Sequence, residues 1–309
     1  MMTNDTQIQK DKELLINHYV EEDKEKYRMQ IKRGTKRLKL NHFYIKLTQH
    51  CNLNCKCCDE FSPLAEEEYI DEKILENDFK RLAELTNSDV DIIILSGGET
   101  LLYKNIASVV GILKKYFPNT KIELFTNGTL LQNASEDFWK MCNQNKIALL
   151  VTVYPIDVDY DRIFKTAIKH RVVCLTQDNI DDSEVKTTWH LPMDLEGKQN
   201  PVSSFLNCMH ANHCFYLNEG KLFPCSIAGN VRHFNKYFNK NLEVSQGDYI
   251  DIHKVKSLDE ILAFLSNPVP FCRYCDVANR TISNKWNLSD RDISEWTLLP
   301  SKNSNCTKH

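Results

Sequence analysis

The sequence has no apolar run long enough to cross a membrane and no strong excess of charge of either sign. Its longest apolar run, residues 147–153, is far shorter than the roughly 20 residues of a transmembrane helix, so we expect no membrane span. Residues 1–10 are polar and lack the apolar segment of a signal peptide, which favours a cytoplasmic protein. The formal net charge is -3, so the chain has no excess of basic residues, and no nucleic-acid partner is expected.

Internal repeats and low-complexity tracts are also missing, so the chain does not fit a repeat protein or a disordered one. At 309 residues with 42% hydrophobic residues it can bury a real core, as one large domain or as a medium domain with a smaller one. Residues 1–38 are charged, with apolar residues at helical spacing, and predict a peripheral helix.

A regular alternation of strand and helix patterns begins near residue 42. Each apolar strand pattern is followed by an amphipathic helix pattern, which predicts parallel strands joined by helical crossovers. Strands are expected at residues 43–47, 91–95, 121–125, 148–153 and 171–175, and helices at 71–85, 106–116, 135–143 and 160–169.

The pattern weakens into a polar stretch at residues 176–204, which we interpret as a boundary or an active-site segment. Beyond it, residues 213–217 and 221–224 flank Asn218-Glu219-Gly220, a turn sequence that predicts a β-hairpin. A helix is expected at residues 258–265, where Asn267-Pro268 follows and stops it.

Cysteine is the residue type that the chain has in excess, with 12 copies. A chain of this size without a signal segment has no need of disulfides, so metal ligation or reduced core thiols are the better interpretations. One group crowds within residues 51–58 and a second is spread over residues 208–275. Three cysteines stand apart from both groups: Cys142, Cys174 and Cys306.

The first group has the spacing Cys51-x3-Cys55-x2-Cys58 and follows the first predicted strand, on a loop at the carboxyl end of the sheet. Three thiolates on a [4Fe–4S] cluster leave one iron free to bind a small molecule, whereas a closed electron-transfer cluster uses four. A structural zinc site is the alternative, but zinc needs a fourth ligand nearby. Cys57 adjoins Cys58 and is expected to have a packing role.

This spacing resembles the signature of the radical S-adenosylmethionine (SAM) superfamily. Ser96-Gly97-Gly98-Glu99-Thr100, at the end of the second strand, resembles the family's Gly-Gly-Glu element, which lies against the methionine part of SAM. Thr126-Asn127-Gly128-Thr129 is similar to the family's turn near the ribose, and Tyr154 ends the fourth strand. Each of these has an ordinary alternative. The first motif could be a strand-to-helix turn capped by Thr100, and the second a common Asn-Gly turn. Tyr154 could be an aromatic residue of the core.

The resemblance implies that Cys51, Cys55 and Cys58 hold the catalytic cluster. It also implies that SAM is bound by residues at the ends of the second, third and fourth strands: Gly97, Gly98, Glu99, Thr100, Asn127 and Tyr154. The expected chemistry is reductive cleavage of SAM to a 5′-deoxyadenosyl radical that abstracts a substrate hydrogen. A flavodoxin- or ferredoxin-type protein is expected as the electron donor.

The second group resembles the twitch domain, a shortened relative of the SPASM domain that holds one auxiliary [4Fe–4S] cluster. Cys208, Cys225, Cys272 and Cys275 are the expected ligands, with Cys214 as an alternative to Cys208. A zinc knuckle with four thiolates is the competing interpretation. Two [4Fe–4S] clusters and SAM are therefore the expected cofactors.

The expected fold is α/β, a partial (β/α)6 TIM-type barrel with a small C-terminal hairpin-plus-helix domain for the auxiliary cluster. The expected division is residues 1–41, an N-terminal helical extension; 42–204, the radical SAM core; and 205–309, the auxiliary cluster domain and tail. The expected activity is oxidation of a small carbohydrate or cyclitol-like molecule or of a glycoconjugate. Alternatives are a sugar dehydratase or epimerase, a peptide-modifying maturase, and a zinc-bound module without catalysis.

The residue that accepts the substrate proton is left unassigned. His190 lies in the polar segment before residue 204 and is a candidate, although a lone histidine is more often structural. Asp157, Arg171 and Trp189 have no better support.

Overall fold

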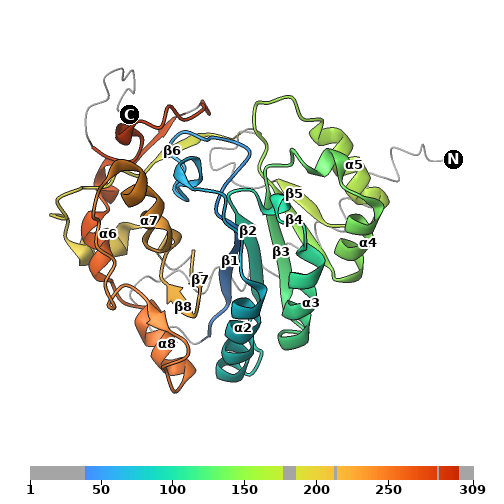
Figure 1. Cartoon of the computed structure of the whole chain (residues 1–309), viewed down its shortest axis with the longest axis horizontal. Coiled ribbons are helices and arrows are strands. Elements are labelled where there is room, and N and C mark those ends of the chain that lie inside the picture. Colours follow the sequence, from blue (N-terminus) through green and yellow to red (C-terminus); the bar gives the residue numbers. More distant parts are fainter. Residues whose placement is uncertain (1–38, 177–185, 212–213, 284, 299–309) are drawn as a thin grey trace.

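A computed structural model describes residues 39–176, 186–211, 214–283 and 285–298 of the chain (Figure 1). Their main feature is an eight-stranded sheet with the order β5-β4-β3-β2-β1-β7-β8-β9. Its strands are β1 (His42–Thr48), β2 (Ile92–Gly97), β3 (Lys121–Thr126), β4 (Ile147–Val151), β5 (Cys174–Thr176), β7 (Tyr216–Asn218), β8 (Lys221–Phe223) and β9 (Ile250–Asp251). Strands β6 (Thr188–His190) and β10 (Thr281–Ser283) pair with each other in a second, antiparallel sheet.

The helices between the parallel strands cover one side of this sheet. They are α2 (Glu72–Thr86), α3 (Ile106–Tyr116), α4 (Glu136–Gln144) and α5 (Tyr160–Lys169). In Figure 1 they line the sheet from β1 to β5, while α6 (Pro201–Asn207), α7 (Ser226–Phe238) and α8 (Leu258–Leu265) gather beyond β7 and β8. The expected α/β class is confirmed, as a mostly parallel sheet consistent with a partial TIM-type barrel.

The alternation of side chains along β1 explains how the sheet separates its core from the site. Phe43, Ile45 and Leu47 are fully buried in the core between the sheet and the helices. Tyr44 and Lys46 point to the opposite side, because successive residues of a strand face opposite ways. There Tyr44 lines the cavity described below, and Lys46 is buried in a polar network.

The predicted helix at residues 71–85 forms as α2, one residue later at each end. The Asp71 carboxylate accepts hydrogen bonds from the backbone N–H groups of Lys73 and Ile74, as an N-cap does. Asn87 ends the helix in the left-handed conformation with φ 52°. Local sequence signals therefore set both ends of this helix.

The predicted hairpin is confirmed, and it extends the main sheet. Its turn residues Glu219 and Gly220 have positive φ values of 49° and 74°, which suit the right-handed twist of a two-residue hairpin. Strand β7 pairs in parallel with β1, and the N–H of Gly220 donates a 2.7 Å hydrogen bond to Asp78 on α2. The sheet thus runs across the predicted boundary at residues 204 and 205, and the domain division stays a prediction.

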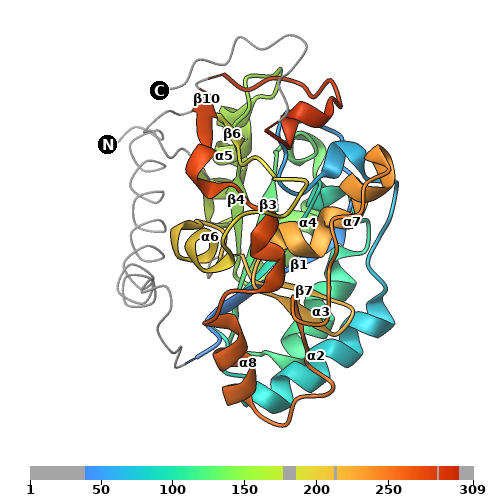
Figure 2. The same ribbon diagram turned by 90° about the vertical axis from the view of Figure 1, so that its left-hand side faces the viewer.

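Other elements differ from the sequence-based expectations. Strand β5 begins three residues later than predicted, and α6, α7, β6, β9 and β10 were not predicted. Strands β6 and β10 are three residues each and pair across about 90 residues of chain, so neither carries a readable period of its own. Figure 2 shows the two strands side by side. The expected N-terminal helix lies outside the described residues.

No helix of the described ranges is long and apolar enough to span a membrane.

Candidate active site

A cavity of ≈ 540 Å³ lies at the carboxyl ends of the parallel strands. In α/β folds the loops at this edge carry the chemistry. All but one of the residues that the sequence assigned to the first cluster and to SAM line this cavity: Cys51, Cys55, Cys58, Gly97, Gly98, Glu99, Asn127 and Tyr154. The exception is Thr100, which is buried behind it and donates from its hydroxyl to the Phe125 carbonyl oxygen over 2.5 Å.

The loop after β1 folds tightly and brings its three cysteines close together. Cys57 and Phe61 take the left-handed conformation, with φ values of 57° and 55°. Burial raises the pKa of the Cys51 thiol to about 12, and it also raises the pKa values of Cys55 and Cys58. Charge on Cys55 adds to the shifts of the other two, which places the three thiols within electrostatic reach. The thiols are therefore neutral at pH 7 until a metal displaces their protons.

Across the described ranges, no three or more His, Cys, Asp or Glu side chains surround a single point closely enough to hold one metal ion. A [4Fe–4S] cluster needs a wider spacing, because each of its thiolates binds a different iron. Three thiols that share the wall of one cavity fit that donor set.

The two glycines after β2 let the cysteine loop approach the strand. A Cβ atom on Gly98 would lie 2.1 Å from the carbonyl oxygen of His50, and one on Gly97 would lie 2.6 Å from the Thr48 hydroxyl. The Gly98 N–H also donates to the Thr48 carbonyl oxygen over 3.0 Å. The close approach that requires these glycines is thus to the chain's own backbone beside Cys51.

Glu99, which is 1% exposed, links the end of β2 to the end of β3. Its carboxylate accepts hydrogen bonds from the Leu101 N–H at 2.9 Å, the Thr126 hydroxyl at 2.7 Å and the Asn127 N–H at 2.8 Å. Burial raises its pKa, and these three donors oppose that shift. A carboxylate has about four acceptor positions, so three are taken and about one is left for a ligand.

Asn127 connects the end of β3 to the cysteine loop. Its side-chain amide donates to Asn52 over 2.8 Å and lies 3.8 Å from the sulfur of Cys51. The amide oxygen accepts from the N–H of Thr129 at 3.0 Å and from its hydroxyl at 2.6 Å. This Asn-Gly turn is therefore tied to the first cysteine.

Tyr154 contacts the cysteines themselves. Its side chain interacts with the Cys55 thiol, and burial followed by the charge of Cys55 raises the pKa of Tyr154 well above its usual value. Trp286 packs edge to face on Tyr154, with ring centroids 5.4 Å apart. The expectation that Tyr154 approaches SAM stays a prediction.

Residues 285–298, here called the C-terminal strap, cover the cysteine loop. The Lys56 N–H donates to the Asn287 carbonyl oxygen at 2.9 Å, and the Ser289 N–H donates to the Asn54 carbonyl oxygen at 2.7 Å. The indole N–H of Trp296 donates to the Cys58 carbonyl oxygen at 2.7 Å. Sequence reasoning missed this segment, because it has no periodicity and lies more than 220 residues from the loop it covers.

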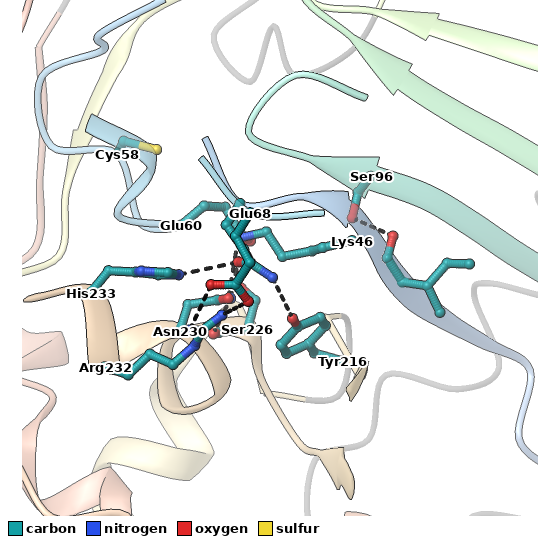
Figure 3. Close-up of polar contacts among 12 residues, drawn as sticks. Lys46, Cys58, Glu60, Glu68, Ser96, Tyr216, Ser226, Asn230, Arg232 and His233 are labelled. Carbon is teal, nitrogen blue, oxygen red and sulfur yellow. Dashed lines mark hydrogen bonds and ion pairs between the residues drawn. The ribbon is translucent and has the colours of Figure 1, made fainter. Parts of the chain in front are cut away.

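A buried polar network lies beneath the loop (Figure 3). The Lys46 ammonium, whose side chain is 1% exposed, lies 2.9 Å from the Glu60 carboxylate and donates to the Asn230 amide oxygen at 3.2 Å. Asn230 in turn donates to Glu60 at 3.0 Å and to the Ser226 carbonyl oxygen at 2.7 Å. Burying the Lys46 ammonium without a partner would cost much folding free energy. The ion pair therefore holds Glu60, two residues after Cys58, against α7.

The second cysteine group gathers around a separate, small cavity of ≈ 20 Å³. Cys208 follows α6, Cys225 precedes α7, and Cys272 and Cys275 lie in and just after the 3-10 helix Pro270–Tyr274. All four line this cavity with apolar neighbours such as Phe205 and Phe271. Burial, followed by charge on the other three cysteines, raises the pKa of Cys275.

Cys214 does not line the small cavity; it lines the large one. Its sulfur lies 3.8 Å from Nδ1 of His210, whose Nε2 lies 3.5 Å from the Asp59 carboxylate. The arrangement favours Cys208 over Cys214 as a member of the second group. His190, the candidate proton acceptor, is not among the residues that line the large cavity.

Comparison with known proteins identifies the class of the central part of the chain. Residues 45–175 match the model of the Radical SAM superfamily, so the chain contains a radical SAM domain, as its cysteine spacing predicted. This family is known for a [4Fe–4S] cluster and SAM.

Among curated relatives, the GTP 3′,8-cyclase of Nautilia profundicola is 26% identical over 161 residues, 48% of this chain and 51% of that protein. The chain thus spans about half the length of that relative. The GTP 3′,8-cyclase of Clostridium botulinum (strain Okra / Type B1) is 23% identical over 281 residues, 85% of this chain and 81% of that protein. A solved structure of BtrN in complex with AdoMet and 2-DOIA has a TM-score of 0.49 at 17% identity, covering 78% of this chain and 94% of that one.

Proposed function

We propose that this chain binds SAM at a [4Fe–4S] cluster held by Cys51, Cys55 and Cys58 and oxidises a carbohydrate or cyclitol-like substrate by hydrogen abstraction. The supporting observation is that these cysteines share one cavity with Glu99 and Asn127, within a radical SAM domain. When bound, the cluster supplies the electron that splits SAM into methionine and a 5′-deoxyadenosyl radical.

The residues of the cavity have distinct parts in this proposal. Three thiolates leave one of four irons without a protein ligand, which is where the amino and carboxylate groups of SAM would bind. Glu99 has about one acceptor position left beyond its three hydrogen bonds, and it would accept an N–H of the SAM amino group there. The C-terminal strap excludes water from the cysteine loop through Trp296 and Trp286.

Oxidation of an alcohol requires a second electron-transfer site. A carbinol that gives its carbon-bound hydrogen to the 5′-deoxyadenosyl radical must then lose one proton and one electron to become a ketone. Cys208, Cys225, Cys272 and Cys275 would hold the acceptor of that electron, an auxiliary [4Fe–4S] cluster. Their separate cavity supports this role, since four thiolates leave no iron open to a substrate.

The test is metal analysis and SAM cleavage with anaerobically purified protein. We expect about eight irons per chain, and about four after Cys51, Cys55 and Cys58 are all changed to Ala. The wild-type protein should form 5′-deoxyadenosine after reduction with dithionite, and the triple variant should form none. Cys142→Ala, which removes a buried thiol outside both groups, is the control and should keep both properties. Zinc in place of iron would contradict the proposal.

The role of the second group has its own experiment. Changing Cys272 and Cys275 to Ala should spare the formation of 5′-deoxyadenosine but abolish oxidised product. Normal product formation by a folded variant would exclude the electron-acceptor role and would favour a redox-neutral dehydration or epimerisation.

Cyclisation of GTP is a second candidate, favoured by the 281-residue match to the Clostridium botulinum enzyme. A triphosphate is usually bound by several cationic groups, arginine above all. Among the described residues, Lys56 and Lys186 are the Lys and Arg side chains that line the large cavity, and Lys56 lies 3.4 Å from the Asp290 carboxylate. This lining supports a less charged substrate.

A further inference from the structure

Buried side-chain atoms without hydrogen-bond partners collect around the large cavity. Within the described part of the chain, six buried side-chain nitrogen or oxygen atoms have no partner. Four of them belong to residues that line this cavity: Ser62, Thr187, Trp189 and Trp286. Of these, the Trp286 side chain interacts with the Cys55 thiol, which leaves Ser62, Thr187 and Trp189. Leaving a buried polar group unpaired is unfavourable, so such a concentration indicates a ligand that completes the bonds.

Two of these groups, on Thr187 and Trp189, lie two residues apart at the start of β6. Thr187 directly precedes β6, and Trp189 lies within it, so residues two apart present their side chains to the same side. Thr187 is 3% exposed and its hydroxyl has no partner. Thr188, between them, instead donates from its hydroxyl to the Lys285 carbonyl oxygen over 3.0 Å. Nε2 of His190, the next residue of β6, also has no partner, but His190 does not line the cavity. Of the unpaired groups on this segment, those of Thr187 and Trp189 therefore belong to residues that line the cavity.

Ser62 adds a group from another segment. It is 5% exposed and begins the 3-10 helix that follows the cysteine loop. An indole N–H can only donate, whereas a hydroxyl can donate or accept. The three groups together favour a ligand that carries several hydrogen-bond acceptors.

The same cavity also offers acceptors. Lys46 and Asn230 both bind Oε2 of Glu60, which leaves Oε1 for a ligand hydroxyl. Asp59 lines the cavity as well, with 44% of its side chain exposed. A ligand with many hydroxyl groups satisfies donors and acceptors alike.

We infer that Thr187 and Trp189, aided by Ser62, form the subsite that binds a polyhydroxylated ring, free or carried on a larger conjugate. This inference rests on the proposed function for the position of SAM, and it adds the residues that recognise the substrate. Binding uses the Thr187 hydroxyl and the Trp189 indole N–H as donors to ring oxygens.

The test is calorimetric titration of anaerobically reconstituted protein with SAM present. The probes are myo-inositol, D-glucosamine and methyl α-D-glucopyranoside, the last standing for a conjugated ring, and the comparators are GTP and an acetylated Ala-Ser-Ala amide. We expect at least one ring probe to bind more tightly than either comparator. Loss of one hydrogen bond in Thr187→Val or Trp189→Phe should weaken that binding about two- to tenfold.

Thr188→Val is the matched control, because it removes a hydroxyl from the same strand that already bonds Lys285. Its affinity for the ring probe should stay within about twofold of the wild type. The folding of both test variants is checked by circular dichroism and iron content. If Thr187→Val does not fold, the affinity of Trp189→Phe for the ring probe tests the subsite.

Three results would overturn the inference: no ring probe binding up to about 20 mM, tighter binding of the peptide or of GTP, or equal affinity in the test variants and the control. The formation of 5′-deoxyadenosine by the same preparation separates this inference from the proposed function. If SAM is cleaved and no ring binds, the subsite is wrong and the proposed SAM chemistry stands. If a ring binds through Thr187 and Trp189 without SAM cleavage, the subsite stands and the proposed chemistry fails.

Discussion

The indole nitrogen of Trp296 donates a 2.7 Å hydrogen bond to the carbonyl oxygen of Cys58, 238 residues earlier in the chain. Trp296 is 3% exposed and packs on Phe61, which follows the same loop. The third cysteine of the proposed cluster is therefore held in place by the C-terminal strap. A domain shortened before residue 285 would lose this contact.

Trp296→Phe tests that link, because it removes the donor and keeps most of the ring packing. The variant should lose iron to a chelator several-fold faster than the wild type, since the loop that carries Cys58 is less restrained. Its free energy of unfolding should fall by about 1–3 kcal/mol, the cost of leaving the Cys58 carbonyl unpaired. Trp139→Phe, a buried tryptophan on α4, is the control and should lose iron at the wild-type rate. Equal rates in both variants would show that the strap does not support the cluster.

Gly98→Ala should displace the cysteine loop, because the added Cβ would lie 2.1 Å from the His50 carbonyl oxygen. We expect lower iron content after reconstitution and a loss of stability, measured by urea unfolding. Gly111→Ala on α3 is the matched control, since no heavy atom lies within 4 Å of its new Cβ. That helical position should gain about 0.5–1 kcal/mol. Full iron content in Gly98→Ala would mean that the loop has more room than this contact indicates.

Glu99→Gln should weaken both the fold and SAM binding. The new amide places a donor where the carboxylate accepted from backbone N–H groups, and the cost is about 1–3 kcal/mol of unfolding free energy. Glu84→Gln, on the exposed face of α2, should change little. Equilibrium dialysis with labelled SAM measures the second effect, and wild-type affinity in Glu99→Gln would leave Glu99 a purely structural residue.

Cys208→Ser and Cys214→Ser separate the two candidates for the auxiliary group. Cys208 lines the small cavity with the other three cysteines, so its loss should remove about four irons per chain. Cys214 lines the large cavity beside His210, and its loss should leave the iron count unchanged. The reverse result would reassign the ligand.

The stability of the protein should fall between pH 6.5 and about 4 through His233. Burial, followed by the charges of Arg232 and Lys46, lowers the pKa of His233 from 6.5 to about 4. Between these two pH values the histidine is protonated in the unfolded chain but not in the folded chain. The contribution of His233 to the free energy of unfolding is therefore complete above pH 6.5 and is lost as the pH falls to 4. The loss is up to about 3 kcal/mol.

His233→Gln keeps a donor toward Gln49, whose Oε1 lies 3.2 Å from the histidine Nε2, and should flatten that part of the stability curve. Urea unfolding at several pH values, compared with the wild type, measures the difference. An unchanged slope would assign the acid sensitivity to other groups, such as Glu68, whose pKa is lowered by its hydrogen bond with Arg232.

The sequence predicted the parallel strands, their crossover helices and the hairpin because each has a local signal. Apolar periodicity marks β1 to β4, Asp71 and Asn87 mark the ends of α2, and Asn218-Glu219-Gly220 marks the turn. The first cysteine group could also be predicted from the sequence, because its three members lie on one short loop directly after a strand.

The sequence by itself thus determined the class of domain and the residues gathered at the ends of the parallel strands. The tertiary structure decided which distant groups meet there. It placed Cys208 with Cys272 and Cys275, and it placed Cys214 in the other cavity. It also turned Glu99 inward and left Thr187 unpaired, since hydrogen bonding of a buried group depends on neighbours that the chain brings from far along the sequence.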